Sequence, residues 1–279
     1  MVDADGAPVT LRFWGARGGI AVPGPDTLRY GGNTACIEMH CGAHLLILDA
    51  GTGLRPLGEA LMRQGQPVDA DLLLSHAHLD HIGGLGFFAP LFQAGTKLRI
   101  HGGHLPTDAL RAALATSLSP PLMPDILAVT RAEISIAALV VQASTLLQPG
   151  LAVTLARLRH PGGAVGYRIT WQRRVVAYVT DTEHVPGTPD AGVLRLAEGA
   201  DLLIYDANFT EAEFPAHVGW GHSTWQEGVR IANAAGVGRL VLFHHDAGRT
   251  DAQMDAIAAA AAAARPGTIA ASEGLVLTI

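Results

Sequence analysis

Four side chains that can bind a metal ion follow closely after an apolar stretch at residues 72–75: His76, His78, Asp80 and His81. In an extended backbone, residues two positions apart point to the same side, so His76 and His78 can bind one ion together. Asp80 and His81 follow where the chain is expected to turn into a helix, and they can face a second ion. Imidazole and carboxylate ligands suit zinc, with manganese or iron as alternatives.

Further potential ligands stand directly after other apolar stretches: His160, Asp181, His244 and His245. Each of them alone would be interpreted as a capping residue or as a residue that supports a ligand. Together they predict that metal-binding side chains gather at one edge of a sheet. Asp49 ends another such stretch, where it either accepts an N–H from a ligand histidine or simply occupies the turn before Gly51.

The elements that position these residues are indicated by short segments rich in Val, Ile and Leu. Strands are predicted near residues 10–15, 35–41, 44–49, 71–75, 97–101, 151–159, 165–171, 174–180, 201–205, 239–243 and 274–279. Helices are predicted over residues 54–64, 84–93, 107–117, 191–198, 224–235 and 252–264. The uncharged stretch 134–156 contains the turn pair Pro149-Gly150, so we expect two strand-like pieces there rather than a membrane span. This alternation predicts one domain over residues 1–279, with a sheet core and helices outside.

Composition narrows the class of protein. Of the 279 residues, 49% are hydrophobic and 16% are charged, which allows a sizeable core and excludes global disorder. The net charge of −6 argues against a broad basic surface for duplex DNA. The acidic N-terminus lacks the apolar region of a signal peptide. Cys36 and Cys41 make no disulfide framework, so a reducing, cytoplasmic location fits, and their spacing in one strand predicts structural thiols on opposite faces.

The pattern His-x-His-x-Asp-His at residues 76–81, together with the later ligands, resembles the metallo-β-lactamase superfamily of binuclear hydrolases over residues 11–279. The resemblance implies an α+β fold, the four-layer αββα sandwich, with the site at one edge of its two sheets. It implies two divalent ions, the first held by His76, His78 and His160, the second by Asp80, His81 and His244, and both bridged by Asp181. We prefer His244 to His245 because an apolar strand followed by histidine at this register resembles ribonuclease Z.

The segment Gly221-His222-Ser223-Thr224 indicates the branch of the superfamily. Ser223 with Gln226 forms a predicted capping box, so a helix is expected to begin there, with His222 just outside it. A helix N-terminus attracts phosphate, and a histidine beside it can protonate a leaving oxygen. The alternative is an ordinary histidine next to a cap. The His-Ser-Thr pattern resembles ribonuclease Z and its small phosphodiesterase relatives, in which the equivalent histidine works near the scissile phosphate.

One departure from ribonuclease Z bears on the substrate. The tRNA-clamping arm of that enzyme often lies between the third histidine and the bridging aspartate, but here the stretch from His160 to Asp181 is short and committed to strands. The negative net charge also gives little affinity for a long RNA. The resemblance, together with these departures from ribonuclease Z, therefore implies a phosphodiesterase for a small cyclic or nucleotide-type diester rather than a tRNA 3′-end endonuclease. Catalysis would use a hydroxide shared by two ions and oriented by Asp80, with His222 as the acid.

Two other hypotheses stay open. A carboxylic-ester, lactone or thioester hydrolase would use the same metal core; the lack of a basic phosphate clamp favours it, and His222 argues against it. A non-catalytic metal-binding partner protein would keep the ligands without activity. Related phosphodiesterases often form dimers, so the resemblance implies a homodimer. We expect the segments 21–30 and 101–124 to flank the site, and Trp220, Trp225 and Phe243 to pack the core rather than line a pocket for a base.

Overall fold

Two mixed sheets form the centre of the protein. The structure, a computed structural model, describes residues 8–279, so the expected absence of a signal peptide concerns residues that lie mostly outside it. Within the described residues each sheet has seven strands. The first, in the order β14-β1-β2-β3-β4-β5-β6, contains β1 (Val9–Gly15), β2 (Cys36–Cys41), β3 (His44–Leu48), β4 (Asp69–Leu73), β5 (Lys97–Gly102), β6 (Glu133–Ala138) and β14 (Val276–Thr278).

The second sheet is built from the C-terminal half of the chain in a corresponding way. In the order β13-β12-β11-β10-β9-β8-β7, it contains β7 (Ser144–Gln148), β8 (Leu151–Leu158), β9 (Ala164–Trp171), β10 (Arg174–Val179), β11 (Leu202–Asp206), β12 (Arg239–Phe243) and β13 (Ile269–Ala270). Central strands such as β11 are buried along their whole length, because both faces of the sheet are covered.

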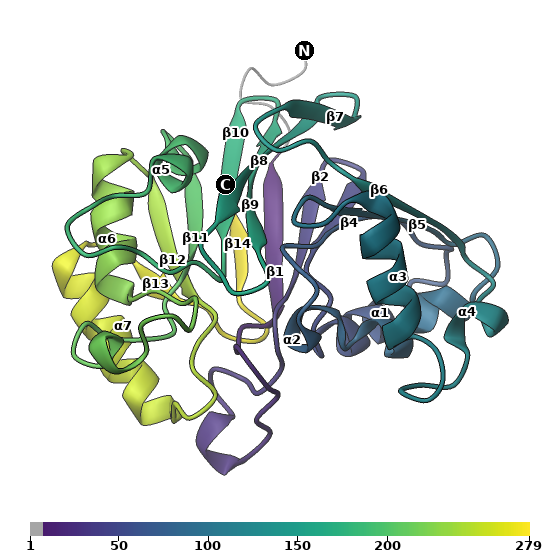
Figure 1. Ribbon diagram of the computed structural model, residues 1–279, viewed down its shortest axis with the longest axis horizontal. Coiled ribbons are helices and arrows are strands. Elements are labelled where there is room, and N and C mark those ends of the chain that lie inside the picture. The colour runs from purple at the N-terminus through teal and green to yellow at the C-terminus, as the bar shows by residue number, and fades with distance from the viewer. Residues whose placement is uncertain (1–7) are drawn as a thin grey trace.

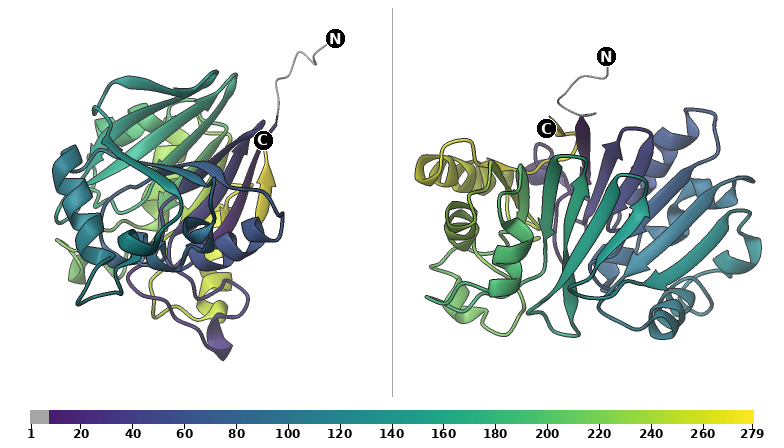
Figure 2. Two further views of the ribbon diagram at one scale, coloured as in Figure 1. Left: turned by 90° about the vertical axis from the view of Figure 1, so that its right-hand side faces the viewer. Right: turned by 90° about the horizontal axis from the view of Figure 1, so that it is seen from above.

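Helices cover the outer face of each sheet, as Figures 1 and 2 show. Beside the first sheet lie α1 (Leu54–Met62), α2 (Leu79–Ile82), α3 (Thr107–Ser117) and α4 (Ile126–Val129), and beside the second lie α5 (Ala191–Ala197), α6 (Trp225–Ala234) and α7 (Asp251–Ala264). The 3₁₀ helices are η1 (Pro25–Thr27), η2 (Leu85–Phe87), η3 (Ala89–Phe92) and η4 (Phe214–Ala216). None of the described helices is long and apolar enough to cross a membrane.

Three buried apolar clusters correspond to the three contacts between the layers. One lies between the two sheets and includes Phe13, Tyr167 and Phe243. A second joins the first sheet to its helices, and a third joins the second sheet to α5, α6 and α7. The predicted αββα sandwich is therefore confirmed. Cys36 and Cys41 are both buried and free, and they belong to different clusters, which confirms that they lie on opposite faces of β2.

The structure corrects the predicted elements at three places. The helix expected at residues 84–93 is instead the pair η2 and η3, separated by Phe88 in an extended conformation. Pro90 explains the break, because in a continuous helix it could not donate an N–H to the carbonyl oxygen of Gly86 and its ring would clash with that carbonyl. The stretch 134–156 contributes to three strands, β6, β7 and β8, rather than two. The very short strand β13 was not predicted either.

The direction of the strands creates one edge where many of them end. In the first sheet, β3, β4 and β5 run parallel, and in the second sheet so do β10, β11 and β12. Strand β8 is antiparallel to β9, which is antiparallel to β10, so β8 and β10 share a direction. The residues that follow these strands therefore meet at a common edge of the sandwich.

Candidate metal centre

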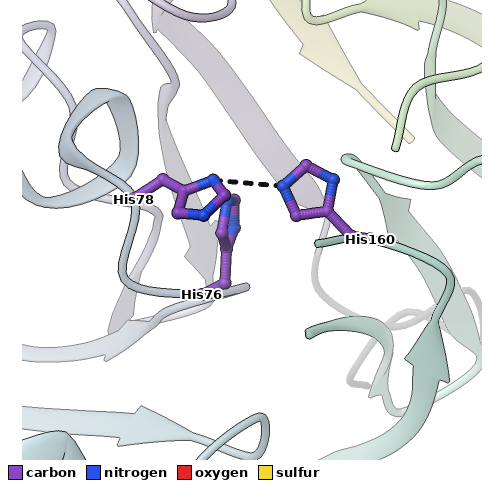
Figure 3. A group of neighbouring side chains, drawn as sticks. All are labelled: His76, His78 and His160. Atoms are coloured by element: carbon purple, nitrogen blue, oxygen red, sulfur yellow. Dashed lines mark hydrogen bonds between the residues drawn. The ribbon is translucent and has the colours of Figure 1, made fainter. Parts of the chain in front are cut away.

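The first group of potential ligands consists of three histidines from two different sheets. His76 and His78 follow β4 of the first sheet, and His160 follows β8 of the second. Their rings converge in Figure 3, where His78 Nδ1 lies 3.1 Å from His160 Nε2. One nitrogen from each of the three rings lies within 4.8 Å of the others, a separation at which they can bind a common ion.

The second group combines Asp80 and His81 from helix α2 with His244, which follows β12. His81 Nε2 lies 3.1 Å from His244 Nε2, and Asp80 Oδ2 lies 3.3 Å and 3.2 Å from these two nitrogens. The backbone N–H of Gly19 donates a hydrogen bond of 2.7 Å to Asp80 Oδ2 and so fixes this carboxylate. These three residues also bring donor atoms within 4.8 Å of one another.

Asp181 lies between the two groups and presents a different oxygen to each. Its Oδ1 atom is 3.9 Å from His76 Nε2 and 3.8 Å from His160 Nε2, which belong to the first group. Its Oδ2 atom is 3.2 Å from His81 Nε2 and 3.4 Å from His244 Nε2, which belong to the second. This is the arrangement that a carboxylate needs in order to bridge two ions.

The electrostatics of the cluster favour a cation. Burial alone would raise the pKa of Asp181, but the surrounding imidazoles hold it well below its ordinary value. Burial would likewise lower the pKa of His81, but the carboxylates of Asp181, Asp49 and Asp80 raise it well above its ordinary value. A bound cation would satisfy the same carboxylates.

The donor atoms fit a divalent ion. His76 Nε2 is buried without a hydrogen-bond partner in the described chain, although it lies near Asp181 and the His76 ring contacts the rings of His78 and His160, among others. Buried polar nitrogen without a partner is costly, and coordination to a metal would remove that cost. Imidazole nitrogens with a bridging carboxylate are the donors that zinc, manganese and iron accept.

Asp49 fixes the orientation of a ligand ring. His81 donates its Nδ1–H to Asp49 Oδ2 at 2.8 Å, which leaves Nε2 directed at the second group. The buried hydroxyl of Tyr178 and the backbone N–H of Ser75 also donate to this carboxylate, at 2.7 Å each. Asp49 therefore accepts an N–H from a predicted ligand, which is the first of the two roles that the sequence suggested for it. Tyr178 was missed, because nothing in its strand marks which side chain its hydroxyl reaches.

Backbone conformation at the strand ends is unusual. Among the described residues other than glycine, only five have positive φ, and three of them are Asp49, Asp181 and His244. Each follows the end of a strand that runs to the common edge. The left-handed region is disfavoured for side chains with a Cβ, so the surrounding structure must hold these residues there. Such strain is typical of functional sites.

His222 stands beside both groups without belonging to either set predicted to bind the ions. Its Nδ1 donates a 3.0 Å hydrogen bond to Asp206 Oδ2 and lies 3.8 Å from Asp181 Oδ1, while its ring stacks on His244 at 5.0 Å. Burial lowers the pKa of His222, but the carboxylates of Asp206, Asp181 and Asp80 outweigh this effect and raise it to about 9. Asp206 was not assigned a role from the sequence, although it ends β11 between two strands that carry ligands.

The predicted capping box is wrong by one residue, because the helix cap is Thr224 and not Ser223. Helix α6 is capped by Thr224, whose side chain accepts a hydrogen bond from the backbone N–H of Glu227. The Ser223 hydroxyl instead contacts His184 Nδ1 at 2.9 Å and the Tyr205 hydroxyl at 3.1 Å. Both serine and threonine are good caps, so the sequence could not separate them.

His245 turns away from the cluster that His244 joins. Its Nε2 donates a 2.9 Å hydrogen bond to the carbonyl oxygen of Ala271. Burial lowers the pKa of His245 to about 3, so it is a neutral residue of the interior. This geometry supports the preference for His244.

The segments 21–30 and 101–124, and the aromatic residues considered in the sequence analysis, differ in where they lie relative to the site. His104 of the segment 101–124 lies 6.5 Å from the His76 ring, whereas Arg29 and Tyr30 of the segment 21–30 are bonded to α7 through Asp255. Phe243 is fully buried, as expected. Trp220, however, is 61% exposed, so the expectation that it packs the core is wrong.

In a comparison with proteins of known sequence, short stretches of this chain match ribonuclease Z proteins. The ribonuclease Z of Exiguobacterium sp. is 41% identical over 71 residues, which are 25% of this chain and 22% of that protein. The ribonuclease Z of Thermobifida fusca is 39% identical over 103 residues, 37% of this chain and 31% of that protein. The chain therefore matches about a third or less of the length of these curated relatives.

Solved structures match the fold over nearly the whole chain. The metallo-beta-lactamase fold protein YhfI from Bacillus subtilis has a TM-score of 0.71 at 22% identity, covering 98% of this chain and 99% of its own. A diphosphatase from the PhnP family has a TM-score of 0.68 at 18% identity, covering 98% of each chain. Human tRNase Z, short form, has a TM-score of 0.67 at 20% identity, covering 96% of this chain and 98% of its own.

The family itself is established by a longer match. The family described as the beta-lactamase superfamily domain matches residues 44–245, well over half of the chain. That range includes every residue of the two groups of potential ligands, together with Asp181 and His222. This protein is a member of the beta-lactamase superfamily.

Proposed function

We propose that this protein is a metal-dependent phosphodiesterase that acts on a small cyclic or nucleotide-type phosphodiester. The names of the similar proteins, ribonuclease Z and a diphosphatase of the PhnP family, support chemistry at phosphate. The observation that carries the proposal is the position of His222, which donates a hydrogen bond to Asp206 and stacks on the candidate ligand His244.

Two divalent ions would be held by the residues described above. We assign His76, His78 and His160 to one ion, Asp80, His81 and His244 to the other, and Asp181 to both. Zinc is the first choice, with manganese and iron as alternatives. When bound, such ions lower the pKa of water and polarise a phosphoryl oxygen.

The protein side chains have separate tasks around these ions. Asp49 and the carbonyl oxygen of Gly221 hold the Nδ1–H groups of His81 and His160, which keeps the Nε2 atoms available as ligands. Asp206 holds Nδ1 of His222 in the same way, so the proton that His222 can give to a leaving oxygen is on Nε2. Asp80, fixed by Gly19, is placed to orient the attacking water.

The test compares a phosphodiester with a carboxylic ester on protein of known metal content. We expect metal-dependent hydrolysis of bis-p-nitrophenyl phosphate to exceed that of p-nitrophenyl acetate. The variant His222→Ala should keep its metal ions and lose about 10²–10⁴-fold in kcat. His40→Ala, a partly exposed histidine in β2 bonded to Glu38, is the matched control and should behave as the wild type.

The opposite pattern would reject the proposal. Faster turnover of p-nitrophenyl acetate or lactones, unchanged in His222→Ala, would identify an ester or lactone hydrolase built on the same metal core. Inactivity toward all of these substrates with two bound ions per chain would favour the non-catalytic hypothesis.

A further inference from the structure

An exposed tryptophan lies in the loop that leads to His222. Trp220 is 61% exposed and Val218 is 62% exposed, whereas Phe209, whose ring contacts that of Trp220, is buried. Most large aromatic side chains serve the core, whereas this indole forms an exposed apolar patch together with Val218. The neighbouring residues Gly221 and His222 contact the candidate metal centre, which places this loop at its margin.

The loop is held rigidly on both sides of the tryptophan. Glu183 uses one carboxylate oxygen, Oε2, to accept hydrogen bonds from the backbone N–H groups of Gly219, at 2.6 Å, and Gly221, at 2.9 Å. The carbonyl oxygen of Gly221 accepts a 2.9 Å hydrogen bond from His160 Nδ1. A Cβ atom at Gly221, where φ is +85°, would lie 2.3 Å from that same nitrogen. The loop is therefore packed directly against a candidate ligand and is tied to it by a hydrogen bond.

The indole ring is supported but not covered. The ring of Phe209 stacks on His217 at 4.2 Å, and both rings meet Trp220 at steep angles, 75° and 86°. Phe209 also contacts the His222 ring at 6.1 Å, so one aromatic cluster joins Trp220 to the proposed acid. Because Trp220 is 61% exposed and neither of these neighbours is stacked in parallel on it, its ring has room for another planar group.

We propose that Trp220 is a stacking platform for the base of a nucleotide-type substrate, and so determines specificity for diesters that carry a planar aromatic group. The inference rests on the proposed function, which it deepens. Stacking on an indole needs no particular pattern of donors and acceptors, so the platform accepts any base. The fixed loop reduces the entropy lost when the base binds.

The test measures binding rather than turnover. Adenosine 5′-monophosphate and ribose 5-phosphate carry the same phosphate and differ by the base, and their dissociation constants are measured by calorimetry on the metal-loaded protein. We expect the wild type to bind the nucleotide about tenfold more tightly. Trp220→Ala should bind both compounds equally, with the affinity for ribose 5-phosphate unchanged.

Two further variants separate stacking from general apolar contact. Trp220→Phe keeps a smaller ring and should retain part of the preference, whereas Trp220→Leu should lose it. Val218→Ala removes a comparably exposed apolar side chain from the same loop and should keep the full preference. In turnover of a nucleotide diester, Trp220→Ala should raise KM and leave kcat unchanged, because stacking acts equally on the ground state and the transition state.

Clear results would overturn the inference. Equal binding of the two compounds by the wild type, or a preference unaffected in Trp220→Ala, would reject a platform for bases. A change from dimer to monomer in Trp220→Ala, without any change in nucleotide affinity, would instead assign the side chain to contact with a second copy. Preferential nucleotide binding by a protein that hydrolyses no diester would contradict the proposed function but not the platform.

Discussion

At the scale of single residues, the site depends on which atom of each side chain is already occupied. His81 donates its Nδ1–H to the carboxylate of Asp49, and His160 donates its Nδ1–H to the carbonyl oxygen of Gly221. In both rings Nε2 therefore stays directed at the candidate metal centre. Asp181 divides its two oxygens between the two groups. These restraints orient the candidate ligands in advance, and the loss of residues that supply such restraints in metal sites typically weakens metal affinity by about 10–100-fold.

The adjacent histidines offer a direct test of the ligand assignment. His244→Ala should lower the number of bound ions per chain, because it removes a donor that lies 3.1 Å from His81 Nε2. His245→Ala should bind as many ions as the wild type and lose about 1 kcal/mol or more of stability, since it removes a buried hydrogen bond to Ala271. Elemental analysis of the purified variants measures both; loss of metal in the His245 variant alone would reverse the assignment.

At the scale of elements, a buried polar network joins strands of the two sheets. Asp71 in β4 accepts hydrogen bonds from His101 at 2.8 Å and Arg99 at 2.9 Å, both in β5, and from Gln148 in β7 of the other sheet at 3.1 Å. Burial would raise the pKa of Asp71, but these partners lower it well below its ordinary value. The charged carboxylate is therefore more stable in the folded chain than in the unfolded one.

This network predicts how stability depends on pH. A depressed pKa contributes stability that is fully present above the unfolded value of about 3.9 and is lost as the pH falls toward the lower folded value. Asp71→Asn should reduce the free energy of unfolding by about 1–3 kcal/mol at pH 7, with a smaller difference below about pH 4. Denaturant unfolding at pH 7 and pH 3 measures this; an equal deficit at both values would contradict it.

At the scale of the whole molecule, the candidate centre joins the two halves of the sandwich. Residues 76–81 come from the first sheet, while His160, Asp181 and His244 come from the second. Ions bound by both sets would link the sheets at the edge where their strands end. Binding to the folded state alone stabilises a protein in proportion to the logarithm of the ion concentration.

Removal of metal should therefore lower the thermal stability of the whole chain. At a free ion concentration a thousand times the Kd, the contribution is about 4 kcal/mol, which corresponds to about 10 °C in Tm. Calorimetry of the chelator-treated and metal-reconstituted protein measures the shift. His222→Ala, which keeps every assigned ligand, should show the same shift as the wild type, and His244→Ala should show a smaller one. Identical Tm values with and without metal would count against ligands shared between the sheets.

The sequence by itself determined which side chains of the segment 76–81 can point together, because local spacing fixes this, and apolar periodicity marked the strands that end at potential ligands. The family and the αββα sandwich followed from the resemblance of these residues to the metallo-β-lactamase superfamily. The sequence preferred His244 to His245 only by resemblance, and it did not pair Asp206 with His222 or assign the cap to Thr224. It also placed Trp220 wrongly in the core. Only the tertiary structure decided these points, because each depends on the direction of a side chain relative to a segment far along the chain, such as Ala271 for His245 and Glu183 for the loop around Trp220. A local sequence pattern does not show which distant segment a side chain will contact.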